Sequence, residues 1–236
     1  DAVSMVQDSE IELAKKSTVV FGETWHKGVI GIVASRLVEQ FYKPTIVFSR
    51  TEGVLTGSAR SVKDFDIHEA IGMCGDLVEQ FGGHKYAAGL TIKMENLDAF
   101  KARFEEIVAR DISEHSLIPE IEYDTDLTLD EIDASFFKGL QRLAPFGPGN
   151  MLPVFRSDGL STNGFARVLK EKHLKITAGQ NGSQFDGIGF GLSGAYPLVS
   201  GNRRFSACYS IEENHFNNRI TLQLRLRDIK ETAQAV

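Results

Sequence analysis

The segment Phe81-Gly82-Gly83-His84-Lys85-Tyr86-Ala87-Ala88-Gly89 combines one imidazole with two adjacent glycines. Glycine adopts positive φ at little cost and leaves the backbone amides uncovered, so a ligand can approach the main chain closely. An imidazole in such a turn can reach a phosphate, and we therefore expect a site at His84, Gly82 and Gly83. The alternative is that Gly82 closes a helix over residues 67–80 and that a strand follows, which would leave His84 as an ordinary surface residue.

A second segment of this kind is Thr56-Gly57-Ser58-Ala59-Arg60-Ser61, which has small residues, hydroxyl groups and one guanidinium on an extended stretch. Amides and hydroxyls of such a strand can bind a phosphate while Arg60 holds it with two parallel hydrogen bonds. We expect Ser58 and Arg60 to form an anion pocket, although Arg60 could instead pair with Asp64. His26 precedes a predicted helix, whose positive N-terminal end favours anions, and it is a weaker candidate.

Asp64, Asp66 and His68 are metal-ligand types at alternate positions. However, Asp66 is a natural N-cap for a helix that begins near Ile67, with Glu69 placed to complete a capping box. No other cluster offers the three or four ligands of a catalytic divalent cation, and neither a Gly-x-Ser-x-Gly elbow nor a Gly-Lys-Ser/Thr phosphate loop is present. We expect no metal and no cofactor in this chain.

The chain has 236 residues, of which 42% are hydrophobic and 25% charged, and these are ordinary values for two globular domains. Its apolar stretches are far shorter than the ~20 residues of a membrane span, and no basic-then-apolar leader opens it. Because the first residue is Asp1, we expect a piece of a longer protein. The two cysteines, Cys74 and Cys208, are far apart, and we interpret both as small core residues of a cytoplasmic, monomeric protein.

The net charge of −6 conceals an asymmetry between the two halves. Residues 1–135 have 13 basic and 25 acidic side chains, whereas residues 136–236 have 13 basic and 7 acidic ones. A basic C-terminal half is a plausible surface for a polyanion, and an acidic N-terminal half would repel nucleic acid except at local pockets.

Residues 1–115 alternate between strand and helix patterns, which predicts a mixed α/β sheet domain. The first residues suit the end of a helix. The predicted strands are 18–21, 45–48, 54–59 and 87–93, and the predicted helices are 28–41, 67–80 and 96–110.

Residues 116–236 predict an all-β domain with one leading helix. Two prolines and two glycines within Pro145-Phe146-Gly147-Pro148-Gly149-Asn150 exclude helix or central strand there. Five strands with alternating polarity then fit a small closed barrel of the oligonucleotide-binding (OB) type. The predicted elements are a strand at 121–123, a helix at 132–143 and barrel strands at 160–169, 173–178, 185–190, 204–211 and 220–226.

The barrel strands carry cations and aromatic side chains together, as single-strand binding requires. Because strand alternation places most aromatic residues, such as Phe205, Tyr209 and Phe216, inside a barrel, we assign only cations to the binding surface. These candidates are Lys172 and Lys175 on one hairpin and Arg203, Arg225 and Arg227 on later strands.

Taken together, these segments strongly resemble the C-terminal half of RecJ-type single-stranded-DNA-specific exonucleases over nearly the whole chain. The matching segments, in order, are Trp25 to Leu37, Lys43 to Val47, Gly57 to Ser61, Phe65 to His68, Phe81 to Gly89 and Leu143 to Asn150.

This resemblance implies a DHH-associated domain over residues 1–115 and an OB barrel after it. It also implies an enzyme that degrades single-stranded DNA from the 5′ end in repair and recombination, with manganese or magnesium bound by a separate phosphoesterase domain. That domain's Asp-His-His signature is absent here, so we expect the fragment alone to be inactive. By resemblance, His84 with Gly82 and Gly83 faces the scissile phosphate, and Ser58 with Arg60 holds a neighbouring one.

Two other functions remain open. A phosphodiesterase for very short oligonucleotides or cyclic dinucleotides also carries a Gly-Gly-His turn, although it would need no extra basic domain. A non-catalytic module that binds nucleic acid, or a protein such as single-strand-binding protein, is the other alternative.

Overall fold

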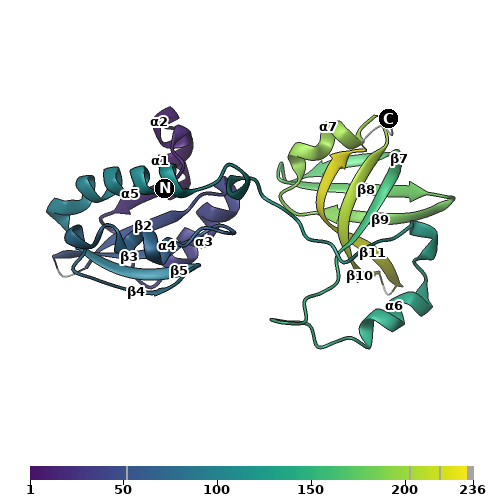
Figure 1. Cartoon of the computed structure of the whole chain (residues 1–236). Coiled ribbons are helices and arrows are strands. Elements are labelled where there is room, and N and C mark those ends of the chain that lie inside the picture. The colour runs from purple at the N-terminus through teal and green to yellow at the C-terminus, as the bar shows by residue number, and fades with distance from the viewer. Residues whose placement is uncertain (52, 202, 218, 233–236) are drawn as a thin grey trace. The chain divides into compact units, whose positions relative to one another are not determined.

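The chain folds as two units, Asp1–Pro119 and Glu120–Val236. The acidic residues between 120 and 135 belong to the second unit, so the charge asymmetry of the sequence does not follow the units: the first has 13 basic and 18 acidic side chains, and the second has 13 and 14. The computed structural model describes residues 1–51, 53–201, 203–217 and 219–232 (Figure 1). The boundary between the units lies four residues after the predicted one. No helix in the described ranges is long and apolar enough to cross a membrane.

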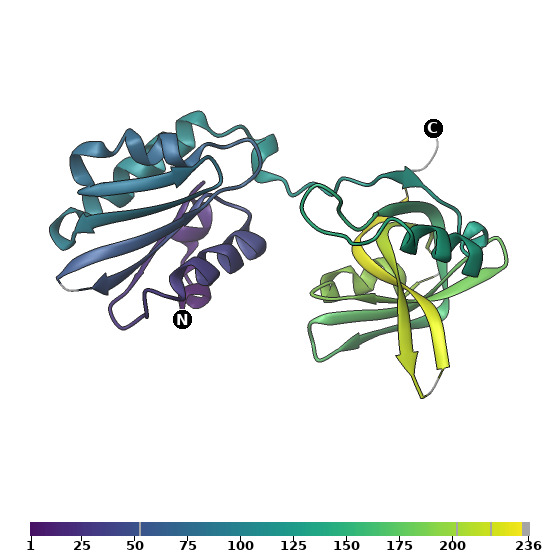
Figure 2. The same cartoon turned by 90° about the horizontal axis from the view of Figure 1, so that it is seen from below.

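The first unit is a five-stranded sheet with helices on both faces (Figure 2). The strand order is β1-β2-β3-β5-β4, in which β1 and β2 are parallel and the other pairs antiparallel. The strands are β1 (Thr18–Gly22), β2 (Thr45–Thr51), β3 (Val54–Arg60), β4 (Gln80–His84) and β5 (Ala87–Lys93), and the helices are α1 (Ala2–Gln7), α2 (Glu10–Ala14), α3 (Ile30–Phe41), α4 (Ile67–Gly72) and α5 (Leu97–Asp111).

Alternating residues of the strands supply two cores, because successive side chains point to opposite sheet faces. Val20 and Val47 pack with α1 and α3, whereas Ile46 and Phe48 pack with α4 and α5 on the other face. Phe100 and Phe104 of α5 stack at 5.8 Å between ring centroids. The helix predicted over residues 96–110 therefore contributes one face to the core.

The single helix predicted for residues 67–80 is wrong. Helix α4 ends at Gly72, a 3₁₀ turn spans Gly75–Leu77, and the chain is extended from Val78 into β4. Gly72 and Gly75 weaken a helix over these residues. The backbone of residues 79–84 instead makes its hydrogen bonds with β5. Gly82 is therefore a strand residue, not a helix cap, and the tight turn is Lys85-Tyr86, directly after His84.

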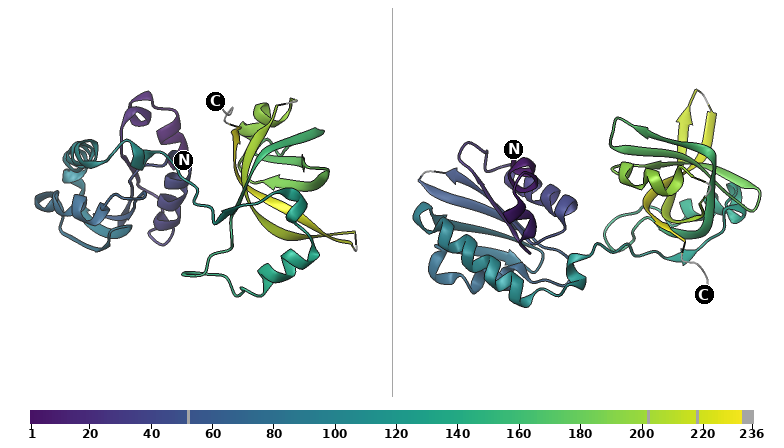
Figure 3. Two further views of the ribbon diagram at one scale, coloured as in Figure 1. Left: turned by 45° about the vertical axis from the view of Figure 1, so that its right-hand side comes forward. Right: turned by 90° about the horizontal axis from the view of Figure 1, so that it is seen from above.

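The second unit contains the predicted five-stranded barrel. Its strands pair in the order β7-β8-β9-β11-β10, and β10 pairs back with β7 to close it. β9 and β11 are parallel and the other barrel pairs antiparallel. The strands are β6 (Thr125–Asp126), β7 (Phe155–Leu169), β8 (His173–Gln180), β9 (Ser183–Gly189), β10 (Phe205–Phe216) and β11 (Arg219–Glu231), and the helices are α6 (Ala134–Gln141) and α7 (Tyr196–Val199). The β10–β11 hairpin extends beyond the other strands (Figure 3).

Three further expectations for the second unit are corrected. Residues 121–123 form no strand, and only Thr125 and Asp126 pair with β7. The leading helix begins at Ala134 rather than Ile132, because the Asp133 carboxylate caps it by accepting a hydrogen bond from the Phe136 N–H at 2.7 Å. Cys208 is half-buried and outside the core, whereas Cys74 is a core residue as predicted.

Candidate nucleic-acid interface

Four of the predicted residues of the first unit, Ser58, Arg60, Gly82 and His84, meet on one open sheet face. In the register of β3, β5 and β4, Ser58 pairs with Gly89 and Gly89 with Gly82, while Arg60 pairs with Ala87 and Ala87 with His84. The residues in between, such as Ala59 and Ala88, point into the core with α4 and α5. The side chains of Ser58, Arg60, His84 and Ala87 therefore point to the opposite face of the sheet. Over β1 and β2, this face is covered by α1 and α3. We call this surface the shelf, and it consists of Ser58, Arg60, Gly82, His84, Ala87 and Gly89.

No core helix covers the outer part of the shelf. Gly89 and every residue of β4 are exposed. A Cβ atom added to Gly82 would meet nothing within 4 Å, and one added to Gly89 would meet only the Gly57 carbonyl oxygen at 4.0 Å. Internal packing therefore does not require glycine at either position, and their backbone is accessible to a ligand.

Gly83 serves a different purpose from Gly82. Its φ is 146°, and a Cβ there would lie 2.3 Å from the Ala87 carbonyl oxygen. Only glycine fits this conformation and this close approach. Gly83 therefore shapes the hairpin that carries His84.

Ser58 and Arg60 are joined to each other and lie against the start of α3. The Arg60 Nη1 donates to the Ser58 Oγ at 3.2 Å and to the Ala59 carbonyl at 2.8 Å. A Cβ on Gly31, in the first turn of α3, would lie 3.1 Å from the Arg60 Nη2 and 3.2 Å from the Ser58 Oγ. Both hydrogen-bond partners of Arg60 among the described residues are neutral, so they orient the guanidinium without an ion pair. The structure shows no ion pair between Arg60 and Asp64, both of which it describes.

Both candidate imidazoles have one ring nitrogen engaged by the backbone. The His84 Nδ1 accepts a hydrogen bond from the Tyr86 N–H at 3.3 Å, and the His26 Nδ1 accepts from the Gly28 N–H at 3.0 Å. Each neutral ring therefore carries its proton on Nε2, as a donor to a ligand. His26 lines a groove with residues of α3 and the N-terminus, and sheet register places only His84 on the shelf.

The barrel candidates do not all come together. Lys175 and Arg225 both pair with Ile188 across adjacent strands and so lie in one row. Lys172 is exposed in the β7–β8 turn and Arg227 is exposed on β11. Arg203 precedes β10 and forms an ion pair with Glu231 at 3.5 Å, at the open end of the hairpin and six residues along β11 from Arg225.

Sequence reasoning also missed residues. Gly31 and Gly89 lie next to Ser58 and Arg60. They could be identified only from which strands and helices are in contact, and this becomes known only with the fold. Phe205 and Tyr209 are fully buried as expected, but Phe216 is 69% exposed, so its assignment to the barrel interior is wrong. Phe216 lies at the tip of the extended hairpin, beyond the barrel core.

The described residues do not fit a catalytic metal. In those ranges, no three His, Cys, Asp or Glu side chains are grouped closely enough to hold an ion. The Asp66 carboxylate instead accepts from the Glu69 N–H at 3.0 Å as the N-cap of α4. We therefore assign no step of a reaction to a metal held by these residues.

The fold and these surfaces define a class of protein, in which an α/β domain with an open sheet face is joined to an OB-type barrel. Family models match both units, the DHHA1 domain over residues 14–110 and the RecJ OB domain over residues 123–228. The chain belongs to the RecJ family.

Individual relatives agree with the family models. The chain is 32% identical to the single-stranded-DNA-specific exonuclease RecJ of Bacillus subtilis over 97% of this chain, and 31% identical to that of Escherichia coli over 87%. It matches crystal structures of Thermus thermophilus RecJ in complex with Mg²⁺ and with Mn²⁺, each with a TM-score of 0.77 and with 27% and 26% identity over 97% and 98% of this chain. It covers 29% and 36% of the first two proteins and about a third of the solved chains, so it spans about a third of its relatives' length.

Proposed function

We propose that this chain is the substrate-holding part of a single-stranded-DNA-specific exonuclease. The observation that carries this proposal is the shelf, on which one guanidinium, one hydroxyl, one imidazole and two bare glycines share a single sheet face. Those groups match the needs of a sugar-phosphate backbone: cationic and hydroxyl donors for phosphate oxygens, and main chain that a ligand can approach.

Each shelf residue then has a distinct task. Arg60 and Ser58 hold a phosphate beside the start of α3, where Gly31 lets the helix amides come close. His84 donates from Nε2 to an oxygen of the phosphate that is cleaved, where negative charge grows in the transition state. The manganese or magnesium that such hydrolysis needs belongs, in this proposal, to the part of the protein outside this chain.

Oligonucleotide binding by the 236-residue chain tests the proposal. We expect salt-sensitive binding to single strands, because each neutralised phosphate releases counterions. Arg60→Ala should weaken binding about tenfold and reduce the slope of log affinity against log salt by about one.

Arg50→Ala is the matched control, because Arg50 lies on the neighbouring strand β2 and its charge is paired with Glu23 at 2.7 Å. Equal affinities and equal salt slopes for the two variants would refute the assignment of the shelf. Binding that does not strengthen with oligonucleotide length would favour the short-substrate phosphodiesterase instead.

A further inference from the structure

The turn that follows His84 is hydrogen-bonded to a separate part of the first unit. The Ile67 N–H donates to the Lys85 carbonyl at 3.1 Å, and the Ser61 N–H donates to the Tyr86 carbonyl at 3.0 Å. Lys85 and Tyr86 are both exposed, so packing of their side chains contributes little to the position of the turn. Its position therefore depends on these two backbone donors as well as on the pairing of β4 with β5.

One peptide group of this turn also contacts the His84 ring. The peptide bond between Lys85 and Tyr86 has the carbonyl that accepts from Ile67, and it also has the N–H that donates to the His84 Nδ1 at 3.3 Å. A peptide group is planar, so a fixed direction of its carbonyl fixes the direction of its N–H. A hydrogen bond accepted by the carbonyl also polarises the group and strengthens its N–H as a donor. The Ile67 N–H therefore acts on the His84 imidazole through one rigid group.

Ile67 can supply this donor because it is the first residue of α4. The N–H groups of the first helical turn have no partner within the helix. The N-cap residue Asp66 accepts from one of them, the Glu69 N–H, at 3.0 Å, and the Lys85 carbonyl accepts from another. The Ile67 side chain is fully buried, so the core fixes the place from which its N–H points. Loss of the cap would loosen this end of the helix and, with it, the anchor of the turn.

A short loop connects Arg60 to the same helix end. Its first residue, Ser61, contacts the turn through its N–H, and the Ser61 hydroxyl closes the loop by donating to the Phe65 carbonyl at 2.8 Å. Val62 and Phe65 are buried in the core. Since Ser61 directly follows Arg60, one loop holds both the strand end that carries the guanidinium and the turn that orients the imidazole.

We propose that Ser61 and Asp66 are positioning residues for His84. Through the loop and the helix end, they hold the peptide group between residues 85 and 86. This group keeps the imidazole proton on Nε2 and fixes the orientation of the ring on the shelf. The use of that donor in catalysis rests on the proposed function, whereas the positioning itself can be measured without a reaction.

Hydrogen exchange of the Tyr86 amide in the 236-residue chain tests the positioning directly, because exchange requires the hydrogen bond to the His84 Nδ1 to open. Asp66→Ala and Ser61→Ala should each raise the exchange rate, followed by NMR, about tenfold. Asp66→Asn and Ser61→Thr should retain the rate of the unmodified chain, because asparagine caps helices as well as aspartate does and threonine keeps the hydroxyl. The imidazole nitrogen resonances, assigned by their loss in His84→Ala, should show a smaller fraction protonated on Nε2 in the two alanine variants.

The complete protein that contains this chain provides a second measurement. Asp66→Ala and Ser61→Ala should lower kcat about five- to tenfold and change KM less than about twofold, because a misplaced donor weakens mainly the interactions formed in the transition state. The two conservative variants should restore kcat.

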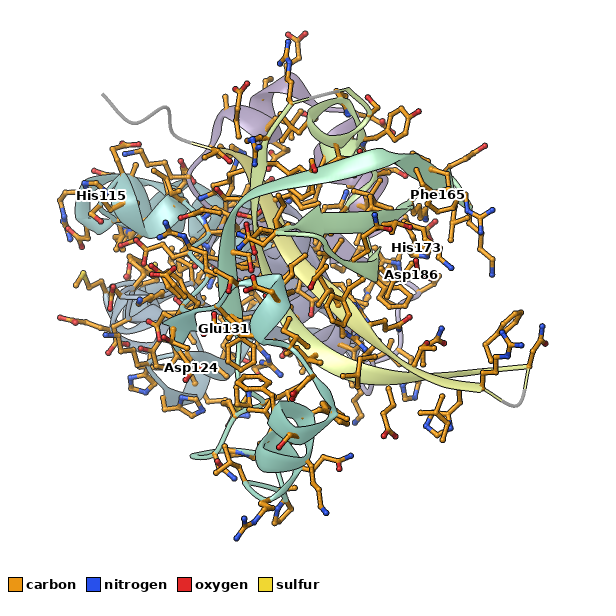
Figure 4. The ribbon with its side chains drawn as sticks, turned by 90° about the vertical axis from the view of Figure 1, so that its right-hand side faces the viewer. His115, Asp124, Glu131, Phe165, His173 and Asp186 are labelled. Carbon is orange, nitrogen blue, oxygen red and sulfur yellow. The ribbon has the colours of Figure 1, made fainter. Side chains whose placement is uncertain are left out.

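Asp133→Ala is the matched control. Asp133 is the N-cap of α6 and accepts from the Phe136 N–H at 2.7 Å, so its loss removes the same kind of cap. It belongs to the second unit, two residues after Glu131, which Figure 4 labels. Asp133→Ala should therefore destabilise its own unit about as much as Asp66→Ala does, without changing Tyr86 exchange or kcat. Thermal melts of all variants check folding.

Two results would refute the proposal: Tyr86 exchange in both alanine variants equal to that of the unmodified chain, or an equal loss of kcat in Asp66→Ala and Asp133→Ala. If Asp66→Ala does not fold, Ser61→Ala decides the question, because it leaves the cap in place. If His84→Ala leaves kcat unchanged, the proposed function of His84 fails, and faster Tyr86 exchange in the alanine variants would still support the positioning.

Discussion

The shelf of the first unit and the outer face of the barrel are both open sheet surfaces, but their side chains differ in size. The shelf has glycine at two of its six positions and alanine at a third, so its backbone is within reach of a ligand. The outer face of the barrel has the long cationic side chains of Arg167, Lys175 and Arg225 in one register row, and these would keep a ligand away from its backbone. Bare backbone imposes one geometry on a phosphate, whereas long side chains adapt to whichever nucleotide is present. Under the proposed function, we expect the shelf to position the phosphate and the barrel to bind nucleotides with little selectivity.

Loss of His84 should separate these two tasks most clearly. In the complete protein that contains this chain, we expect His84→Ala to lower kcat about 10²- to 10³-fold while changing DNA affinity less than about twofold, because its donor acts mainly on charge that forms in the transition state. Single-turnover cleavage of a labelled single strand measures kcat, and anisotropy measures affinity. A uniform loss of affinity without a change in kcat would remove His84 from catalysis.

The adjacent glycines offer a comparison within the shelf itself. Gly83→Ala should destabilise the first unit by about 2 to 4 kcal/mol, because its Cβ would collide with the Ala87 carbonyl and its φ is unfavourable for alanine. Gly82→Ala should change stability by less than about 0.5 kcal/mol, yet weaken DNA binding, since its methyl group projects onto the shelf. Urea unfolding followed by the fluorescence of Trp25, the only tryptophan, measures the first effect. Equal stabilities of the two variants would contradict the structural role of Gly83.

The two units should also respond differently to alkali. Burial raises the pKa of the Cys74 thiol to about 11 and that of the Tyr209 phenol to about 12, against ordinary values of 9.0 and 10.0. Above the ordinary value, the unfolded chain releases a proton that the folded chain keeps, so stability falls with rising pH. The first unit should therefore lose up to about 2 to 3 kcal/mol between pH 9 and 11, and the barrel a similar amount between pH 10 and 12.

Urea unfolding at a series of pH values measures these losses, with Trp25 as the probe of the first unit and far-ultraviolet circular dichroism as the probe of the barrel. Cys74→Ala and Tyr209→Phe should each remove the dependence from one unit alone. A common onset of destabilisation in both units, unaffected by these variants, would show that other groups control it.

Much of the barrel could be predicted from sequence because long stretches of its strands alternate between buried and more exposed residues. Strand β8 ends two residues after its predicted end, and β11 begins one residue before its predicted start but continues five residues past its predicted end. The same alternation separates Phe185, which packs against the core, from Phe190, which lies five residues later and is exposed. Both lie in the one strand predicted over residues 185–190, and their odd separation of five residues places them on opposite faces of it.

The shelf was harder to predict because no local pattern marks its edge strand. Residues 80–84 are all exposed and contain no alternation, so only hydrogen bonding to β5 makes them a strand. Ser58 and Arg60 are 24 residues away from Gly82 and His84 along the chain, and the sequence linked them only through a resemblance. The intervening strand β5 supplies the physical link, and no short-range rule predicts which strand will lie between two others.

The position of the His84 imidazole depends on the main-chain conformation around it more than on packing against neighbouring side chains. Gly83 has a positive φ that other residues avoid, and the Tyr86 N–H donates a hydrogen bond to the His84 Nδ1. Lys85 and Tyr86 form the connecting turn, and both are exposed at its tip. The side chains of these two turn residues could therefore be changed to tune solubility or to attach a label. The His84 ring should keep its orientation as long as residue 83 is glycine.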